Sequence, residues 1–386
     1  MLIYLMVFAV SFGLTLWGMR LEKKENKKGF WVCMVLAVLL IAGLAGLRDE
    51  TVGTDSLPYW NWVAKAMQAS DLQGVMAEGR LTEPAFTLLL YVAAKWLKDF
   101  HWLYFMNALC AYGFCMATLV RFRKVLSLPF AWISYLLLFY SNSLNQMRQA
   151  TAMTMILLAF SYLMEKKYLP YAALTVFACL FHNSAIVSVF FLALYLVLKK
   201  WDTIWTKGLV VGGAAAGVLL WKPLFLFLNQ IGIVQDRFMG YVNRAEFSNL
   251  SLNPVIVRLP FTLLVLVFYG EFVKEKSSER LEFRKPEADF LLVMMLLEMV
   301  ISELRVFSVD LYRICLYFGV FRCLGIGRLV AALKESPEHQ KWAKPVMAAL
   351  LAMLVVIWLY QVVLQGNDEI YPYTSGLLHI SAETFF

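Results

Sequence analysis

The feature that most constrains this chain is a succession of long apolar segments separated by short charged loops. A membrane-spanning helix needs about 20 mostly apolar residues. Nine segments reach or approach that length: 2–19, 30–47, 102–120, 144–164, 208–228, 254–273, 287–303, 311–330 and 345–364. Because 61% of the 386 residues are hydrophobic and only 16% are charged, an ordinary soluble or disordered protein is excluded. We therefore predict an all-α, polytopic membrane protein that forms one domain over residues 1–386.

Two apolar regions do not match the length of one span. Residues 128–141 are apolar but short, and residues 168–198 are too long for one straight crossing. The polar group His182-Asn183-Ser184 divides the second region. We predict two short helices that meet at His182, with one long tilted helix as the alternative.

The basic residues indicate how the chain is oriented. Of the 35 lysines and arginines, 22 lie in six loops: 20–29, 121–124, 165–167, 199–207, 274–285 and 328–344. By the positive-inside rule these loops are cytoplasmic, so the net charge of +8 reflects topology rather than nucleic-acid binding. The remaining connections then face outward: 48–101, 141–148, the turn at His182, 221–253, 303–310 and the C-terminal end 365–386.

This orientation requires that segment 84–97 does not cross the membrane. The segment is short and lies between Glu83 and Lys98, so we predict an outer interfacial or re-entrant helix. The expected total is about 12 spans, with both chain ends outside. Such a protein would be a multi-pass membrane protein; the family resemblance described below implies a bacterial plasma (inner) membrane.

The first outer group of polar residues runs from Arg48 to Tyr59. Gly53 permits a tight turn, and Asp55 follows it as a candidate general base or ligand of a sugar hydroxyl. Arg48 is expected at the membrane edge, where a phosphate headgroup would lie. In the alternative interpretation Asp55 only caps the next helix.

The second group is the polar island Ser141–Ala150, between two apolar runs. Arg148 offers a planar set of donors suited to a phosphate or carboxylate, and Asn145 and Gln149 add polar amides at the start of a membrane helix. The alternative is an interfacial loop in which Arg148 reaches toward lipid headgroups.

Further candidates lie elsewhere on the predicted outer side. His182 can titrate near neutral pH and can donate to a phosphate oxygen, although a lone histidine in an apolar stretch is more often structural. Arg313 and Tyr317 are four residues apart and would share a helix face. Arg305 lies in the loop before them, where Glu303 could simply pair with it.

Motifs for nucleotide, metal and hydrolase chemistry are missing. The chain has no Walker A, GxGxxG, HExxH or GxSxG pattern, and its six cysteines show no CxxC spacing. We therefore expect no cofactor and no metal, with an outer cation held by Asp55 and Glu50 as an open alternative. The sequence does not favour an enzyme that uses nucleotides.

The motifs in their order along the chain resemble the EpsG family, which is grouped with the Wzy-type polysaccharide polymerases. The matching residues are Arg48, Val52-Gly53-Thr54-Asp55, Tyr59, Asn145-x-x-Arg148-Gln149-x-x-Ala152, Phe181-His182-x-Ser184-Ala185 and Tyr371-Pro372-Tyr373. The resemblance implies a GT-C-like membrane glycosyltransferase. Its donor and acceptor would be oligosaccharides linked to undecaprenyl diphosphate, polymerised at the outer face. Membrane lipid, chain-length regulators and flippases are the implied partners, without nucleic acid.

The resemblance also suggests roles for the candidate residues. Asp55 would accept the proton of the acceptor hydroxyl, and His182 would assist at the diphosphate. Arg148 and Arg313 would bind the donor diphosphate. Arg48 or Arg305 would add second contacts, and Tyr59, Asn145, Gln149 and Tyr317 would complete the substrate site. Sugar identity, linkage and stereochemistry do not follow from the sequence.

Two rival functions remain open on the sequence alone. A lipid-linked oligosaccharide flippase or another transporter would also carry arginines, but along a path open to both faces of the membrane. A membrane O-acyltransferase could use His182 as its base, but its thioester donor would come from the cytoplasm.

Overall fold

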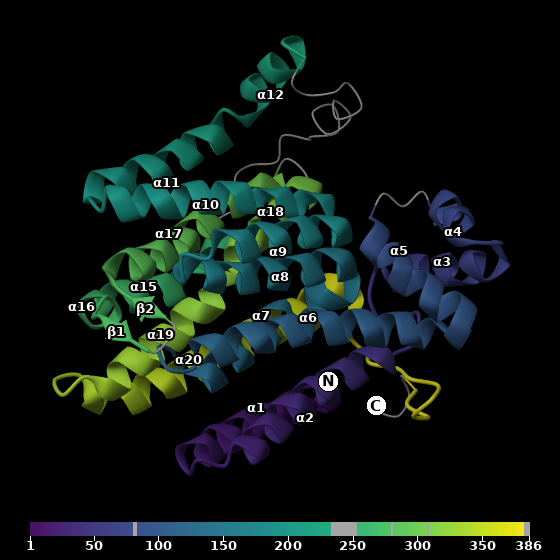
Figure 1. Ribbon diagram of the computed structural model, residues 1–386, viewed down its shortest axis with the longest axis horizontal. Helices are drawn as coiled ribbons and strands as arrows, with labels where there is room; N and C mark the ends of the chain where they lie inside the picture. Colours follow the sequence, from purple (N-terminus) through teal and green to yellow (C-terminus); the bar gives the residue numbers. More distant parts are fainter. Residues whose placement is uncertain (80–82, 233–252, 279–280, 307–308, 382–386) are drawn as a thin grey trace. The chain divides into compact units, whose positions relative to one another are not determined.

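The computed structural model of the protein describes residues 1–79, 83–232, 253–278, 281–306 and 309–381 (Figure 1). The chain divides into two compact units. The first unit contains Met1–Ser188 and Lys344–Phe386, and the second contains Val189–Ala343. Most of the predicted outer loop 221–253 and the last five residues of the chain lie outside the described residues. Each unit is described by itself.

The first unit is helical throughout its regular structure. Its elements are α1 (Leu2–Lys23), α2 (Lys27–Gly46), α3 (Ser56–Gln68), α4 (Leu72–Gly79), α5 (Pro84–Tyr91) with the π-helix η1 (Val92–Leu97), α6 (Phe100–Phe122), α7 (Leu128–Asn145), α8 (Met147–Met164), α9 (Tyr168–Phe181) and the 3₁₀ helix η2 (Asn183–Val187). Helix α20 (Gln340–Leu359) leads back into this unit and continues into the π-helix η5 (Tyr360–Leu364) and the 3₁₀ helix η6 (Asn367–Glu369).

The long helices of the first unit pack in a row. Helix α1 packs on α2, α2 on α6, α6 on α8 and α8 on α9, while α7 contacts α1, α6 and α8 (Figure 1). Ser11 links three of these helices, because its hydroxyl donates to Ala37 O at 3.0 Å and accepts from Trp132 Nε1 at 2.9 Å. Such bonds satisfy polar groups where lipid offers no partner.

The second unit combines helices with one short hairpin. Its elements are α10 (Ser188–Lys200), α11 (Ile204–Leu219), α12 (Trp221–Gln230), α14 (Asn253–Ile256), α15 (Leu259–Val267), α16 (Tyr269–Phe272), β1 (Lys276–Ser277), β2 (Glu282–Phe283), α17 (Lys285–Ile301), the 3₁₀ helix η4 (Ser302–Val306), α18 (Val309–Gly319) and α19 (Phe321–Glu335). Strands β1 and β2 are antiparallel, with Lys276 opposite Phe283. Helix α17 packs against α11, α15, α18 and α19.

Six helices among the described residues are long and apolar enough to cross a membrane. They are Leu2–Lys23, Lys27–Gly46, Phe100–Phe122, Asn183–Lys200, Tyr312–Glu335 and Gln340–Leu364. The bent pair α11 and α12 would make a seventh, although the two helices meet at 81°. The all-α, multi-pass character is therefore confirmed, but the described residues show fewer clear spans than the 12 we expected.

Three segments that we had read as single spans are interrupted. The segment 254–273 consists of the short helices α14, α15 and α16, and Pro260 starts α15. Segment 208–228 bends after α11. Segment 144–164 contains a break at Gln146, whose φ of −94° and ψ of 52° separate α7 from α8. Proline and polar residues account for these interruptions, which a hydropathy average conceals.

Two predictions about short segments agree with the structure. Helix α9 ends at Phe181, His182 is extended, and a new helical stretch begins at Asn183, so the predicted division at His182 is confirmed. The apolar helix Pro84–Leu97 has 14 residues. At 1.5 Å per residue it is about 21 Å long, too short for a hydrocarbon layer of about 30 Å.

Candidate functional site

The loop after α2 is held against the C-terminal segment in the first unit. The amide of Asp49 donates to Thr374 O at 3.1 Å, that of Gly53 to Glu369 O at 2.9 Å, and that of Thr54 to Asp368 O at 3.2 Å. Residue numbers rise in one segment as they fall in the other, so the two run antiparallel. Two segments more than 300 residues apart in sequence are therefore joined by backbone hydrogen bonds.

Gly53 sits where the loop approaches the end of α7. Its φ of +108° is unfavourable for any other residue. A Cβ atom at this position would lie 2.5 Å from Asn145 Oδ1 and 2.9 Å from Ser56 Oγ. The loop therefore requires glycine for both its backbone conformation and its close contact.

Asn145 ties the loop to the C-terminal segment. Its buried side chain accepts from the Asp55 amide at 3.2 Å through Oδ1 and donates to Asp368 O at 2.9 Å through Nδ2. Both polar atoms of the side chain are bonded within the protein and hold the segment that carries Asp55. The sugar contact that we expected for Asn145 stays a prediction.

Asp55 directly precedes α3 and is partly exposed. It occupies the N-cap position, but its side chain makes no capping hydrogen bond to the helix. The capping interpretation is therefore not what the structure shows. The hydrogen bond from its amide to Asn145 places Asp55 beside the end of α7.

Arg48, which we predicted to meet a phosphate headgroup, is enclosed by the protein. Its side chain is buried, with Nη1 donating to Ala45 O at 2.6 Å and Nη2 to Leu144 O at 2.9 Å. The guanidinium also lies 3.9 Å from the ring centre of Tyr104. Because carbonyl oxygens and an aromatic ring surround it, Arg48 joins α2 to the end of α7 rather than contacting a headgroup.

Arg148 and His182 come together around a residue that we did not predict. Glu83, which precedes α5, accepts from Arg148 Nη1 at 2.8 Å through Oε2. Its other oxygen, Oε1, lies 3.3 Å from His182 Nδ1, within ion-pair distance but without the alignment of a good hydrogen bond. We call Glu83, Arg148 and His182 the open cluster.

The open cluster combines one buried acidic side chain with two partly exposed basic side chains. The Glu83 side chain is 7% exposed, whereas those of Arg148 and His182 are 25% and 26% exposed. Burial by itself would raise the pKa of Glu83, but the contact with His182 and the charge of Arg148 outweigh it and lower that pKa. Glu83 is therefore an anion at neutral pH, facing two groups that remain accessible from outside.

Aromatic rings border the open cluster. The Arg148 guanidinium lies 5.3 Å from the ring centre of Trp62 and 5.7 Å from that of Phe86. Tyr59, predicted to orient sugars, is buried and packs on the same two rings at 5.2 and 5.8 Å. Tyr59 therefore supports these rings from within, and Gln149, another predicted sugar ligand, is also buried.

The remaining predicted residues belong to the second unit. Arg313 and Tyr317 lie on α18, as expected, and Tyr317 is fully buried. Arg305 is exposed, with its guanidinium 5.8 Å from the ring centre of Tyr312.

The second unit contains a cluster of its own around Glu298. Its Oε1 accepts from Arg258 Nε and from Arg322 Nη2, each at 2.8 Å. Arg258 also donates to Pro254 O at 2.7 Å and to Tyr312 Oη at 3.1 Å. We call Arg258, Glu298 and Arg322 the closed cluster, because all three side chains are buried.

One group in the described part of the chain has the donor atoms for a metal ion. It consists of Glu271, Glu338 and His339, in the second unit. Glu271 already contacts Lys274 Nζ at 2.7 Å and His339 Nδ1 at 3.1 Å, so its charge is balanced by the protein. The alternative pair Asp55 and Glu50 does not belong to such a group among the residues described.

Glu83 was not predicted from the sequence to be part of the site. It was noted only as a charged residue beside an apolar segment. The available signal was its position directly before Pro84, where it starts a helix too short to cross a membrane. That position alone does not reveal which basic residues it meets.

Comparison with known proteins gave one match. The model of the EpsG family matches residues 31–375, which is most of the chain. No curated protein and no solved structure matches this chain. The matched range includes every residue of the open and closed clusters.

Proposed function

Since the chain belongs to the EpsG family of Wzy-type polysaccharide polymerases, we propose that it joins oligosaccharide repeat units carried on undecaprenyl diphosphate. The reaction takes place at the outer face of a bacterial plasma membrane. The observation that carries this proposal is the open cluster, where two partly exposed basic side chains meet Glu83. Arg148 also lies 5.3 Å from the ring centre of Trp62 on α3, the helix that Asp55 precedes. The product is a capsular, exo- or O-antigen polysaccharide.

Asp55 acts on the acceptor in the proposed reaction. An acceptor hydroxyl oxygen forms the new bond to the anomeric carbon of the donor sugar. The bond from that carbon to the diphosphate oxygen breaks, and its electron pair leaves with the diphosphate. Asp55 takes the hydroxyl proton as general base. Because the diphosphate of the lipid is the leaving group, no nucleotide is needed at this step.

Arg148 and His182 act on the leaving group. Charge develops on the diphosphate as the bond breaks, and positioned donors stabilise that charge best. A guanidinium has five N–H donors, and the bond to Glu83 uses one of them. Glu83 holds Arg148 and His182 in place before the substrate arrives. Arg305 and Arg313 remain sequence-based predictions for further diphosphate contacts.

The test uses cells in which the chromosomal gene is deleted and a variant gene supplies the protein. Asp55→Asn and Arg148→Ala should reduce long polymer by at least about a hundredfold, the lower end for losing a catalytic proton-transfer group. Gel electrophoresis of the extracted polysaccharide measures the chain length. Immunoblots of membranes show that each variant is present at the normal level.

Matched controls separate the site from general damage. Asp71→Asn keeps the oxygen that accepts from the Gly74 amide, and Arg20→Ala changes an exposed arginine at the end of α1. Both should leave polymer length unchanged. Normal long polymer in Asp55→Asn and in Arg148→Ala would disprove the proposal.

Sidedness is tested separately by cysteine labelling. A cysteine introduced at position 55 or 182 should react with an impermeant reagent added outside intact spheroplasts. Labelling only after the membrane is opened would place both residues in the cytoplasm and refute an outer-face reaction.

A further inference from the structure

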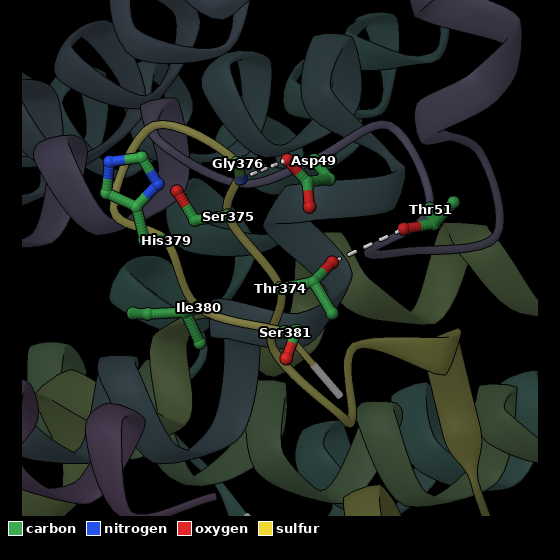
Figure 2. A pocket seen from close by; sticks show the side chains of 8 residues that line it. All are labelled: Asp49, Thr51, Thr374, Ser375, Gly376, His379, Ile380 and Ser381. Atoms are coloured by element: carbon green, nitrogen blue, oxygen red, sulfur yellow. Dashed lines mark hydrogen bonds between the residues drawn. The ribbon is translucent and has the colours of Figure 1, made fainter. Parts of the chain in front are cut away.

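A pocket in the first unit lies between the loop after α2 and the end of the C-terminal segment (Figure 2). Asp49 and Thr51 line it from the loop, and the C-terminal segment contributes Thr374, Ser375, Gly376, His379, Ile380 and Ser381. None of the residues considered above as catalytic or diphosphate-binding lines this pocket.

The chemistry of the pocket is that of hydroxyl recognition. Its polar side chains are a carboxylate, an imidazole and hydroxyl groups, which together accept and donate hydrogen bonds. No lysine or arginine is among its lining residues. A phosphate or a sulfate would therefore meet the carboxylate of Asp49 without a balancing cation, whereas a neutral polyhydroxylated ligand fits.

The backbone around the pocket is held in a fixed shape. Ser375 and Ile380 exchange two backbone hydrogen bonds at 2.9 Å, and the Gly376 amide donates to Asp49 Oδ1 at 2.8 Å. His379 closes this turn with a φ of +53°. A non-glycine residue in that region is strained, and such strain persists where the surrounding structure holds it and often marks a functional segment.

The two hydroxyls that face each other across the pocket can be changed without touching this frame. Thr51 Oγ1 and Thr374 Oγ1 are 3.4 Å apart, and Figure 2 shows them meeting between the loop and the C-terminal segment. This contact is long and exposed, so it contributes little to stability and is free to give way to a ligand hydroxyl.

The pocket and Asp55 lie at opposite ends of the same paired segments. Asp49 pairs with Thr374 and Gly376 beside the pocket, and Thr54 pairs with Asp368 next to Asp55. Asp55 follows Asp49 by six positions in the sequence, so their backbones are at most about 22 Å apart. A short oligosaccharide with one end at Asp55 can extend that far.

We propose that this pocket binds a neutral sugar of the oligosaccharide at a distance from the reacting end. The inference rests on the proposed function, because it identifies a second contact of the same substrate. Asp49, Thr51 and Thr374 supply the hydrogen bonds to the sugar hydroxyls, with His379 at the edge. The pocket retains the chain between successive additions, so its loss shortens the polymer without abolishing the linkage reaction.

The first experiment measures chain length in cells. The double variant Thr51→Val with Thr374→Val removes both hydroxyls at constant shape, and His379→Ala removes an exposed side chain. We expect at least a twofold fall in mean chain length, with products of one or two additions still formed. Leu377→Ser, an exposed residue in the same segment that does not line the pocket, should behave as wild type.

The second experiment measures binding without turnover. Purified Asp55→Asn protein in detergent is heated with single repeat units released from the polysaccharide of the producing strain, or with inorganic phosphate. The repeat unit should raise the unfolding temperature, and the valine pair should remove that shift. Phosphate should give no shift that depends on the two threonines.

The outcomes separate the two proposals. Wild-type chain length in the valine pair and in His379→Ala, or a repeat-unit shift that survives the valine pair, would overturn the sugar pocket. The polymerase itself fails only if Asp55→Asn and Arg148→Ala retain long polymer, whatever the pocket variants do. Loss of all products in the valine pair at a normal protein level would also overturn a role limited to chain retention.

Discussion

The open and closed clusters each place basic side chains around one glutamate, but their exposure differs. In the open cluster, about a quarter of the Arg148 and His182 side chains is accessible. In the closed cluster, Arg258, Glu298 and Arg322 are 7%, 2% and 6% exposed. The same residue types therefore occupy two different environments.

The difference in exposure indicates different roles for the two clusters. An accessible cation can exchange a protein carboxylate for a substrate phosphate, because water and ligand can reach it. A buried cation has lost its hydration and depends on the one carboxylate that was buried with it. We therefore propose that the open cluster contacts substrate and that the closed cluster maintains the fold.

The largest effect is expected on removing the acid of the closed cluster. Glu298→Ala leaves Arg258 and Arg322 buried without their shared carboxylate, which should cost about 3–5 kcal/mol of the free energy of unfolding. Unfolding in detergent, followed by intrinsic fluorescence, measures the loss. Glu298→Gln keeps an acceptor and should lose less. Wild-type stability in Glu298→Ala would remove the basis for calling this cluster structural.

A smaller loss of stability is expected in the loop beside the open cluster. Gly53→Ala adds a methyl group 2.5 Å from Asn145 Oδ1 at a φ of +108°, which should cost about 1–3 kcal/mol and displace Asp55. Gly366→Ala is the control, because its φ is +64° but its Cβ would meet no atom within 4 Å. If both variants lose equal stability and equal activity, the contact with Asn145 is unimportant.

The acid of the open cluster should matter more for activity than for stability. Glu83→Gln removes the charge that holds Arg148 and His182, and we expect only about 1 kcal/mol of destabilisation because both partners are partly hydrated. Polymer length should fall sharply, since the leaving-group contacts lose their orientation. Glu83→Asp should recover part of the activity. A destabilisation as large as that of Glu298→Ala would erase the distinction between the two clusters.

The smallest effect is a dependence of stability on pH. The pKa of Glu83 is lowered from its ordinary value of 4.5, so its contribution to stability is fully present above that pH. The contribution is lost as the pH falls through the lowered pKa in the folded protein. The stability difference between wild type and Glu83→Gln should therefore be constant from neutral pH to about 5 and shrink in more acidic solution. A difference that grows with acidity would contradict the ion pairing.

Several features of the site were predictable because they depend on local sequence. The polar residues that interrupt an apolar run indicated the break at His182, and Gly53 indicated a tight turn. The order of the motifs also indicated the family. These signals survive in the sequence because helix length, turn conformation and membrane burial are decided over a few neighbouring residues.

Other features depended on which segments meet. Arg48 and Arg148 are both arginines next to apolar helices, but one is enclosed by carbonyl groups and the other reaches the surface. Glu83 gained its importance only from the positions of α8 and α9. The described residues also show fewer clear spans than expected, because hydropathy does not reveal where Pro260 or Gln146 breaks a helix.

The sequence by itself determined an all-helical, multi-pass membrane protein of the EpsG family, because apolar length, basic loops and motif order are properties of the linear chain. Only the tertiary structure decided that Glu83 joins Arg148 to His182, and that the C-terminal segment pairs with the loop of Asp55. Hydrogen bonds and ion pairs between distant segments are set by three-dimensional packing. A residue's type gives its possible partners, and burial and geometry select among them.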